Sequence, residues 1–109
     1  MTKRINKINE LIKHNIAEII SRELDLKSGV FITVAKVDTT SDLRYTRIFV
    51  SIFPEKETDY VWKSLEHELY RVQGILNKKL KMKPLPRIEF KLDITELKAD
   101  EIEKLLKKI

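Results

Sequence analysis

Few side chains in this sequence are suited to catalysis. The 109 residues include no Cys and only two His, His14 and His67, although His and Cys supply many of the general bases, nucleophiles and metal ligands of enzymes. His14 shares a predicted helix face with Glu18, a pattern more typical of a solvated side chain than of a ligand. His67 lies between two glutamates but lacks the second His of a zinc-binding helix. We therefore expect no catalytic residue, no metal site and no enzymatic activity.

The sequence also lacks the loops that commonly bind nucleotides. Neither GxGxxG nor the P-loop pattern occurs, and the two glycines, Gly29 and Gly74, are too few for a glycine-rich phosphate cradle. We expect no cofactor and no small-molecule substrate.

Basic residues are concentrated in one part of the chain. Segment 71–91 carries seven bases and one acid, a net charge of +6, whereas the whole chain has a net charge of +5. Its bases are Arg71, Lys78, Lys79, Lys81, Lys83, Arg87 and Lys91. The lysines follow a predicted bend at Gly74, where the free amides that open a new helix would also attract an anion. These features favour nucleic-acid binding, although such lysines can equally be the solvated face of an amphipathic helix.

The first segment predicts a long amphipathic helix. Between Lys3 and Leu24, isoleucines recur every three or four residues, which places them on one helix face. They are Ile5, Ile8, Ile12, Ile16, Ile19 and Ile20. We expect this face to pack on a sheet.

Three segments predict the strands of that sheet. Val30–Val37 is rich in β-branched residues, Tyr45–Phe53 is partly alternating, and Arg87–Asp93 alternates strictly between apolar and charged residues. The polar residues 38–42 predict a turn between the first two strands. Pro54 ends the second strand because it has no amide hydrogen for a ladder.

A second helical pattern begins near Thr58 and is interrupted at Gly74. We expect two helices joined by a sharp bend at this glycine, with the second one closed by the segment from Pro84 to Pro86. The apolar positions between Asp100 and Ile109 predict a closing helix.

The expected order is α-β-β-α-(bend)-α-β with a C-terminal helix, in a single domain of residues 1–109. It is an α+β fold, a three-stranded sheet with helices on one face, and it has the arrangement of a type II KH domain. KH domains clamp single-stranded nucleic acid with a GxxG loop between two helices. The matching stretch here is Gly74-Ile75-Leu76-Asn77, which lacks the second glycine.

The aromatic residues are a weaker indication of nucleic-acid binding. Phe31, Phe49, Phe53, Tyr60 and Trp62 could stack on bases, but aromatics in strands and on helix faces belong to the core more often. We do not assign them to a binding site.

Nearly the whole chain resembles the ribosome-binding factor A family of bacterial KH-like proteins. The resemblance is carried by RINKINELIKHNIAEIISREL at the start, ITVAKVDTTSDLRYTRIFVSIF in the middle and PRIEFKLD near the end. Its most specific part is the turn Ser41-Asp42-Leu43-Arg44 with the strand that follows. The resemblance implies binding to the immature small (30S) ribosomal subunit and its 16S rRNA, a role in late maturation and rRNA processing, and a link to growth in the cold.

We expect the RNA-binding surface to combine basic residues of the first helix, of the hairpin turn and of the predicted bend. The expected RNA-binding residues are Arg4, Lys7, Arg44, Arg71, Gly74, Asn77, Lys78, Lys79 and Lys81. No leader peptide or membrane span is apparent in the sequence, so we expect a cytoplasmic monomer without membrane contacts.

Two other functions are compatible with the sequence. A general single-stranded nucleic-acid-binding KH-like protein would bind short unstructured oligonucleotides with comparable affinity. A protein-interaction module would instead use its basic face to meet an acidic protein partner.

Overall fold

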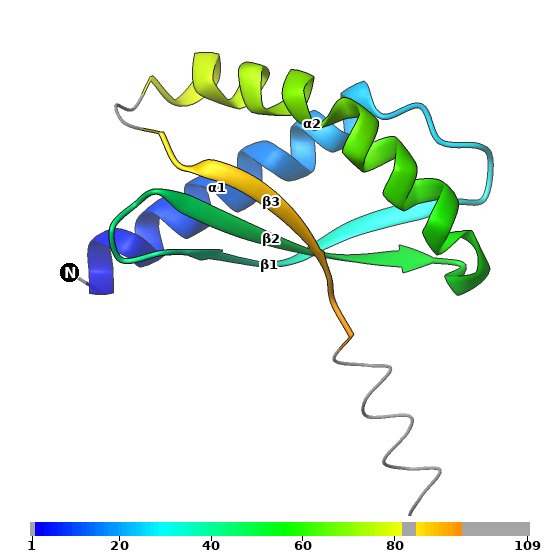
Figure 1. Cartoon of the computed structure of the whole chain (residues 1–109), viewed down its shortest axis with the longest axis horizontal. Coiled ribbons are helices and arrows are strands. Elements are labelled where there is room, and N and C mark those ends of the chain that lie inside the picture. Colours follow the sequence, from blue (N-terminus) through cyan, green and yellow to red (C-terminus); the bar gives the residue numbers. More distant parts are fainter. Residues whose placement is uncertain (1, 82–84, 95–109) are drawn as a thin grey trace, which may run out of the picture.

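The computed structural model describes residues 2–81 and 85–94 of the chain, which form a two-layer α+β domain. The element order is α1 (Thr2–Glu23), β1 (Phe31–Thr39), β2 (Tyr45–Phe53), a short 3-10 helix (Glu55–Glu57), α2 (Thr58–Leu80) and β3 (Arg87–Leu92). Both long helices lie on the same side of the sheet (Figure 1). The expected α+β, KH-like architecture with helices on one face is therefore confirmed.

The isoleucine face of α1 forms the centre of the core. Ile12 and Ile16 have no exposed surface, and Ile8, Ile19 and Ile20 are buried as well. The sheet and α2 contribute most of the other buried side chains, namely Val37, Ile48, Val50, Val61, Leu65, Val72, Leu76, Ile88 and Phe90. This face of α1 thus packs against the sheet and against α2, as its sequence period predicts.

The sheet has the order β1-β2-β3, with an antiparallel pair followed by a parallel one. Phe31 lies opposite Phe53 at one end of the hairpin, and Tyr45 lies opposite Arg87 where β3 begins. The register of β1 and β2 shifts between Val34 and Lys36, which is a β-bulge. All three predicted strands are present, with β1 displaced from the expected Val30–Val37 toward the turn.

The two central helices expected on either side of Gly74 are one continuous helix, α2, so that prediction was wrong. Val72 and Leu76, one helical turn apart, have no exposed surface. Their burial outweighs the helix-propensity cost of about 1 kcal/mol that a glycine carries. The axis of α2 nevertheless changes direction along its length (Figure 1), so a bend exists without a break in the helix. The expected C-terminal helix lies outside the described residues.

A single glutamine fixes β3 to α2. The Gln73 side-chain oxygen accepts a hydrogen bond from the Ile88 amide at 2.8 Å, and its nitrogen donates to the Pro86 carbonyl at 3.3 Å and to the Asn77 side-chain oxygen at 2.9 Å. Gln73 therefore satisfies an amide that β3 presents away from β2.

No helix within residues 2–81 and 85–94 combines the length and apolar character needed to cross a membrane.

The continuity of α2 makes a prediction about its glycine. Among the described residues, no heavy atom outside the helix's own backbone lies within 4 Å of a Cβ built at Gly74. Gly74→Ala should therefore raise the free energy of unfolding, by about 0.5–1 kcal/mol, because alanine favours the helix. Gly29→Ala is the matched control, since Gly29 has a φ of +83° and should lose about 1 kcal/mol. Denaturant unfolding followed by circular dichroism measures both. A loss of stability in Gly74→Ala would show that the bend requires glycine.

The role of Gln73 can be tested in the same way. Gln73→Leu leaves the Ile88 amide without its acceptor and should lower the free energy of unfolding by about 1–3 kcal/mol. Gln73→Glu keeps an acceptor oxygen and should lose less. Equal losses in the two variants would mean that this amide does not determine the effect.

Candidate nucleic-acid interface

Basic side chains from three elements gather toward one end of the domain. The start of α1, the loop between β1 and β2, and the end of α2 all lie toward this end in Figure 1. We call it the basic end, and it comprises the exposed residues Arg4, Lys7, Arg44, Lys78, Lys79 and Lys81. Six of the nine residues predicted to bind RNA thus lie toward the same end of the domain, on segments far apart in the sequence.

The lysines at the end of α2 attract anions through their side chains alone. We expected the free amides of a helix beginning after Gly74 to attract anions. That prediction was wrong, because α2 continues through Gly74 and no helix begins there. The residues Lys78 and Lys79 instead occupy the last turn, where cations interact favourably with the helix dipole. Lys81 ends the helix in a left-handed conformation with φ of 49°, and its amide donates to the Asn77 carbonyl at 3.3 Å.

Most of these cations have no ion-pair partner among the described residues. Within the described part of the chain, Arg4, Lys7, Lys78 and Lys81 form no ion pair, whereas the Lys79 ammonium lies 3.9 Å from a Glu18 carboxylate oxygen of α1. Unpaired exposed cations remain available to phosphate groups.

Arg71 lies apart from the basic end and already has partners. Its guanidinium donates to the Glu23 carbonyl at 2.9 Å and lies 3.2 Å from the Glu23 carboxylate and 2.7 Å from that of Glu68. It joins α2 to the end of α1, and a contact with RNA stays a prediction for this residue. The Asn77 side-chain oxygen accepts a hydrogen bond from the Gln73 side chain, and Gly74 lies within α2. Neither residue therefore belongs to a loop like the GxxG loop of KH domains.

A network of hydrogen bonds fixes the loop that carries Arg44. The Thr40 hydroxyl donates to an Asp42 carboxylate oxygen at 2.6 Å and accepts from the Tyr45 amide at 3.1 Å. The same Asp42 oxygen accepts from the Arg44 amide at 3.1 Å. These bonds, together with the nearby Arg44 guanidinium, hold the pKa of the Asp42 carboxyl below the value near 3.8 of an ordinary aspartate. Leu43, with φ of 61°, completes the tight loop.

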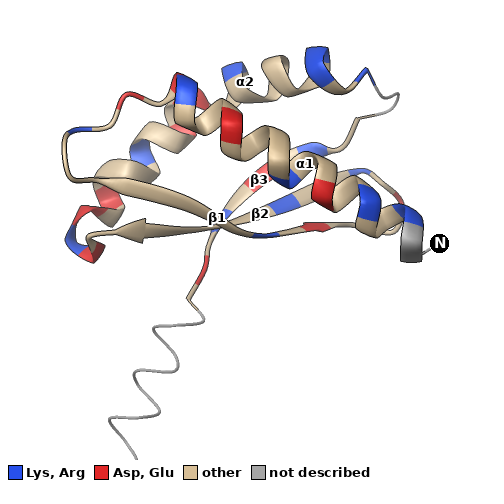
Figure 2. Cartoon of the chain, turned by 180° about the vertical axis from the view of Figure 1, so that it is seen from behind, with Lys and Arg blue, Asp and Glu red and all other residues tan. Residues whose placement is uncertain are grey.

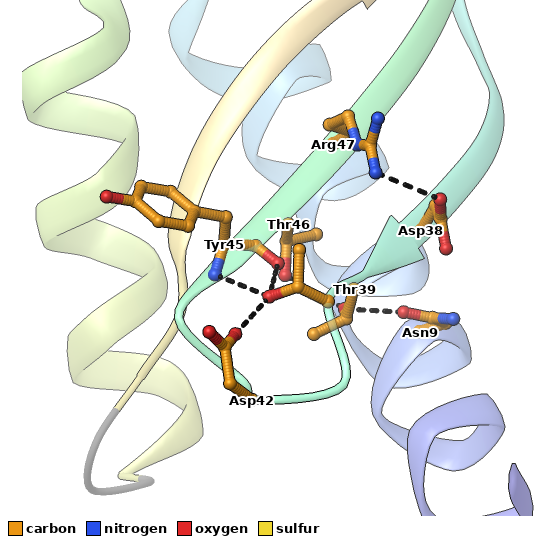
Figure 3. A network of polar contacts seen from close by, with 8 residues as sticks. Asn9, Asp38, Thr39, Asp42, Tyr45, Thr46 and Arg47 are labelled. Atoms are coloured by element: carbon orange, nitrogen blue, oxygen red, sulfur yellow. Dashed lines mark hydrogen bonds and ion pairs between the residues drawn. The ribbon is translucent and has the colours of Figure 1, made fainter.

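A buried polar contact connects this end of the hairpin to α1. The hydroxyls of Thr39 and Thr46 are 2.9 Å apart, and the Thr39 hydroxyl donates to the Asn9 side-chain oxygen at 2.5 Å. Figure 3 shows Asn9 and Thr39 meeting on one side of the sheet, whereas Tyr45 and Arg47 point away from α1. Alternate residues of β2 thus point into the core and toward the opposite face of the sheet.

Sequence reasoning missed that opposite face. Phe31 and Phe53 are 63% and 68% exposed, and Tyr45, which we did not consider, is 43% exposed. Cross-strand pairing brings basic residues beside some of these aromatic residues. The alternation of apolar and polar residues in β2 could by itself have indicated that its aromatic residues lie on this face. Tyr60 and Trp62 instead pack partly buried against the core.

No group of three or more His, Cys, Asp or Glu residues that could hold a metal ion occurs in the described ranges.

Figure 2 shows basic and acidic positions alternating along α1, so the positive charge belongs to the end of the domain and not to the whole helical layer.

Comparisons with known proteins agree with the sequence resemblance. The family model of ribosome-binding factor A matches residues 4–106. Ribosome-binding factor A of Natranaerobius thermophilus is 36% identical over 107 residues, which cover 97% of this chain and 82% of that protein. The Halothermothrix orenii protein of the same name is 32% identical over 108 residues, or 98% of this chain and 88% of its own.

Two structures of the Thermus thermophilus protein have a similar fold. The crystal structure of ribosome-binding factor A from Thermus thermophilus has a TM-score of 0.69 at 25% identity and covers 81% of this chain and 94% of its own. A homology model of the Thermus thermophilus protein, fitted into a cryo-electron microscopy map of a 30S complex, has a TM-score of 0.66 at 26% identity, with coverages of 78% and 90%.

The loop network predicts a pH-dependent contribution to stability. Because its pKa is lowered on folding, ionised Asp42 stabilises the fold above the ordinary aspartate pKa, and this contribution is lost as the pH falls through the lowered value. Asp42→Asn keeps an acceptor oxygen but removes the charge. The free energies of unfolding of the two proteins should therefore differ at neutral pH and converge in acid. A difference that is independent of pH would contradict a role for the charge.

Proposed function

Because the chain belongs to the ribosome-binding factor A family, we propose that it binds the immature small ribosomal subunit through its 16S rRNA and assists late maturation. In this proposal it acts by binding as a cytoplasmic monomer, without catalysis, and its role includes rRNA processing and adaptation to cold. The structural relative fitted into a map of a 30S complex supports the choice of partner.

The observation that carries the proposal is the basic end. Arg4 and Lys7 from α1, Arg44 from the loop, and the lysines of α2 are exposed at one end of a two-layer domain. Their charge can neutralise several backbone phosphates at once, and folded rRNA presents such phosphates from strands that are close in space. A surface built from three segments therefore suits a folded RNA better than an isolated strand.

The alternative of a general KH-like binder loses its structural basis. The stretch Gly74-Ile75-Leu76-Asn77 lies inside α2 and forms no loop, so the backbone amides that clamp a single strand in KH domains are occupied by helix hydrogen bonds. The proposed site at the basic end relies on side-chain charge instead.

Reversing the charge of two lysines tests the proposal. We expect Lys78→Glu with Lys81→Glu to weaken binding to small subunits by about tenfold or more and to reduce its salt dependence, because two phosphate contacts are lost. Stability should change little because both side chains are exposed. Lys79 is left unchanged, since a glutamate there would face Glu18.

The matched control is Lys56→Glu with Lys63→Glu, which alters the net charge equally at exposed positions in the 3-10 helix and the first half of α2. Co-sedimentation with purified small and large subunits across a salt series measures both variants and the parent. Equal losses of affinity in the two double variants would show that binding depends on net charge and not on the basic end. Binding of the parent to large subunits would contradict the proposed partner.

A further inference from the structure

The face of the sheet opposite the helices carries an ordered set of aromatic and basic side chains. Within the described residues, no helix or loop lies on this face (Figure 1). Strand alternation places Tyr45, Arg47, Phe49, Ser51 and Phe53 of β2 on it. Their neighbours on the same face are Phe31, Thr33, Lys36, Asp38, Arg87, Glu89 and Lys91. We call this set the open sheet face.

The middle row of the open sheet face is an aromatic ring between two lysines. Phe49 lies opposite Lys36 of β1 and opposite Lys91 of β3. The Lys36 ammonium is 5.7 Å from the centre of the Phe49 ring, a cation–π distance. Both lysines are exposed, so their charges remain accessible next to a ring that is only half-buried.

The neighbouring rows add a second ring and two guanidinium groups. Tyr45 lies opposite Arg87, and Arg47 lies between Asp38 and Glu89. A shallow pocket of about 270 Å³ is lined by Thr40, Tyr45, Arg47, Glu89 and Lys91. The closest approach of the Arg47 and Asp38 side chains is 3.8 Å, and both are about half exposed, so this ion pair contributes little and can open.

The spacing of these groups fits unstacked bases. Alternate residues of a strand are about 7 Å apart, so Tyr45, Arg47 and Phe49 present three planar groups in a line at that interval. This is about twice the 3.4 Å rise per nucleotide of one strand in a duplex. Only a single strand, whose bases can separate, can place successive bases on such a line, and aromatic rings and guanidinium planes both stack on bases.

The combination of basic side chains and aromatic rings on the open sheet face favours RNA over an acidic or apolar protein surface. Four bases, Lys36, Arg47, Arg87 and Lys91, outnumber two acids, Asp38 and Glu89, and each base adjoins an aromatic residue or the pocket. The face is also continuous with the basic end, because Arg44 precedes Tyr45 and the Arg87 amide donates to the Arg44 carbonyl at 2.8 Å. A strand whose phosphates contact Arg44 and Arg87 would have its next bases over Tyr45.

We propose that the open sheet face is a second RNA-binding surface, which holds a short single-stranded segment with bases stacked on Tyr45, Arg47 and Phe49 and phosphates paired with Lys36, Arg87 and Lys91. This inference rests on the proposed function in taking RNA as the ligand, but it assigns a different surface and a different form of RNA. The basic end contacts folded RNA by charge, and the sheet binds an adjoining unpaired strand by stacking.

The test uses the full chain and a fluorescein-labelled single-stranded oligouridylate of about ten nucleotides. Tyr45→Leu and Phe49→Leu should each weaken binding, measured by fluorescence anisotropy, by about 5- to 150-fold. Tyr45→Phe keeps the ring and should bind like the parent. Tyr70→Ala is the matched control, because Tyr70 of α2 is 92% exposed and lies away from the sheet.

Thermal unfolding of each variant identifies any loss of binding that comes from misfolding, and Phe49→Leu keeps the test decisive if Tyr45→Leu is unstable. Amide chemical shifts of β2 that move on addition of the oligonucleotide would support the proposal independently of mutation. Shifts confined to α1 and α2, or unchanged affinity in both leucine variants, would overturn it.

Co-sedimentation of the same variants separates this inference from the proposed function. A parent that does not pellet with small subunits would contradict the proposed function, whatever the oligonucleotide result. A parent that pellets, while Tyr45→Leu and Phe49→Leu bind the oligonucleotide normally, would overturn only the assignment of the sheet. Loss of pelleting in the leucine variants without any oligonucleotide binding by the parent would assign the face to a protein partner and overturn the proposal.

Discussion

Burial of the isoleucine face of α1 is the constraint on which the rest of the structure depends. Ile12 and Ile16 lie where the helix, the sheet and α2 meet, and neither has exposed surface. Removing one such side chain typically costs about 2–5 kcal/mol, a large share of the 5–15 kcal/mol that stabilises a domain of this size. Because α1 and α2 must both cover the apolar side of a three-stranded sheet, the opposite side is left without a covering helix among the described elements.

This arrangement separates the two surfaces that we assign to RNA. The basic end is formed where α1 starts, α2 ends and the hairpin turns, so its charges come from three elements that the core holds together. The open sheet face is the reverse of the packed face, and each outward aromatic on β2 alternates with a core residue such as Thr46 or Ile48. Fixing the core therefore fixes the elements that carry both surfaces, and hydrogen bonds hold the loop that carries Arg44.

Several elements could be predicted because their signals are local. The period of the α1 isoleucines and the strict alternation of Arg87–Leu92 are direct consequences of helix and strand geometry, and the structure has both elements. The break at Gly74 was predicted from a local rule that tertiary packing overrides, since Val72 and Leu76 hold α2 together across the glycine. The partners of Arg71 could not be predicted from local sequence either, because one of them, Glu23, lies 48 positions away.

The sequence by itself determined the fold class, the membership of the family and the concentration of positive charge between residues 71 and 91, because periodicity, motif and charge are properties of the chain. Only the tertiary structure decided which charges share a surface and which are already paired. It placed the start of α1, the loop between β1 and β2 and the end of α2 at one end of the domain. It also paired Arg71 with Glu23 and placed Phe49 between Lys36 and Lys91. Such neighbours depend on strand register and helix packing, which join residues far apart in the sequence and leave no local signal.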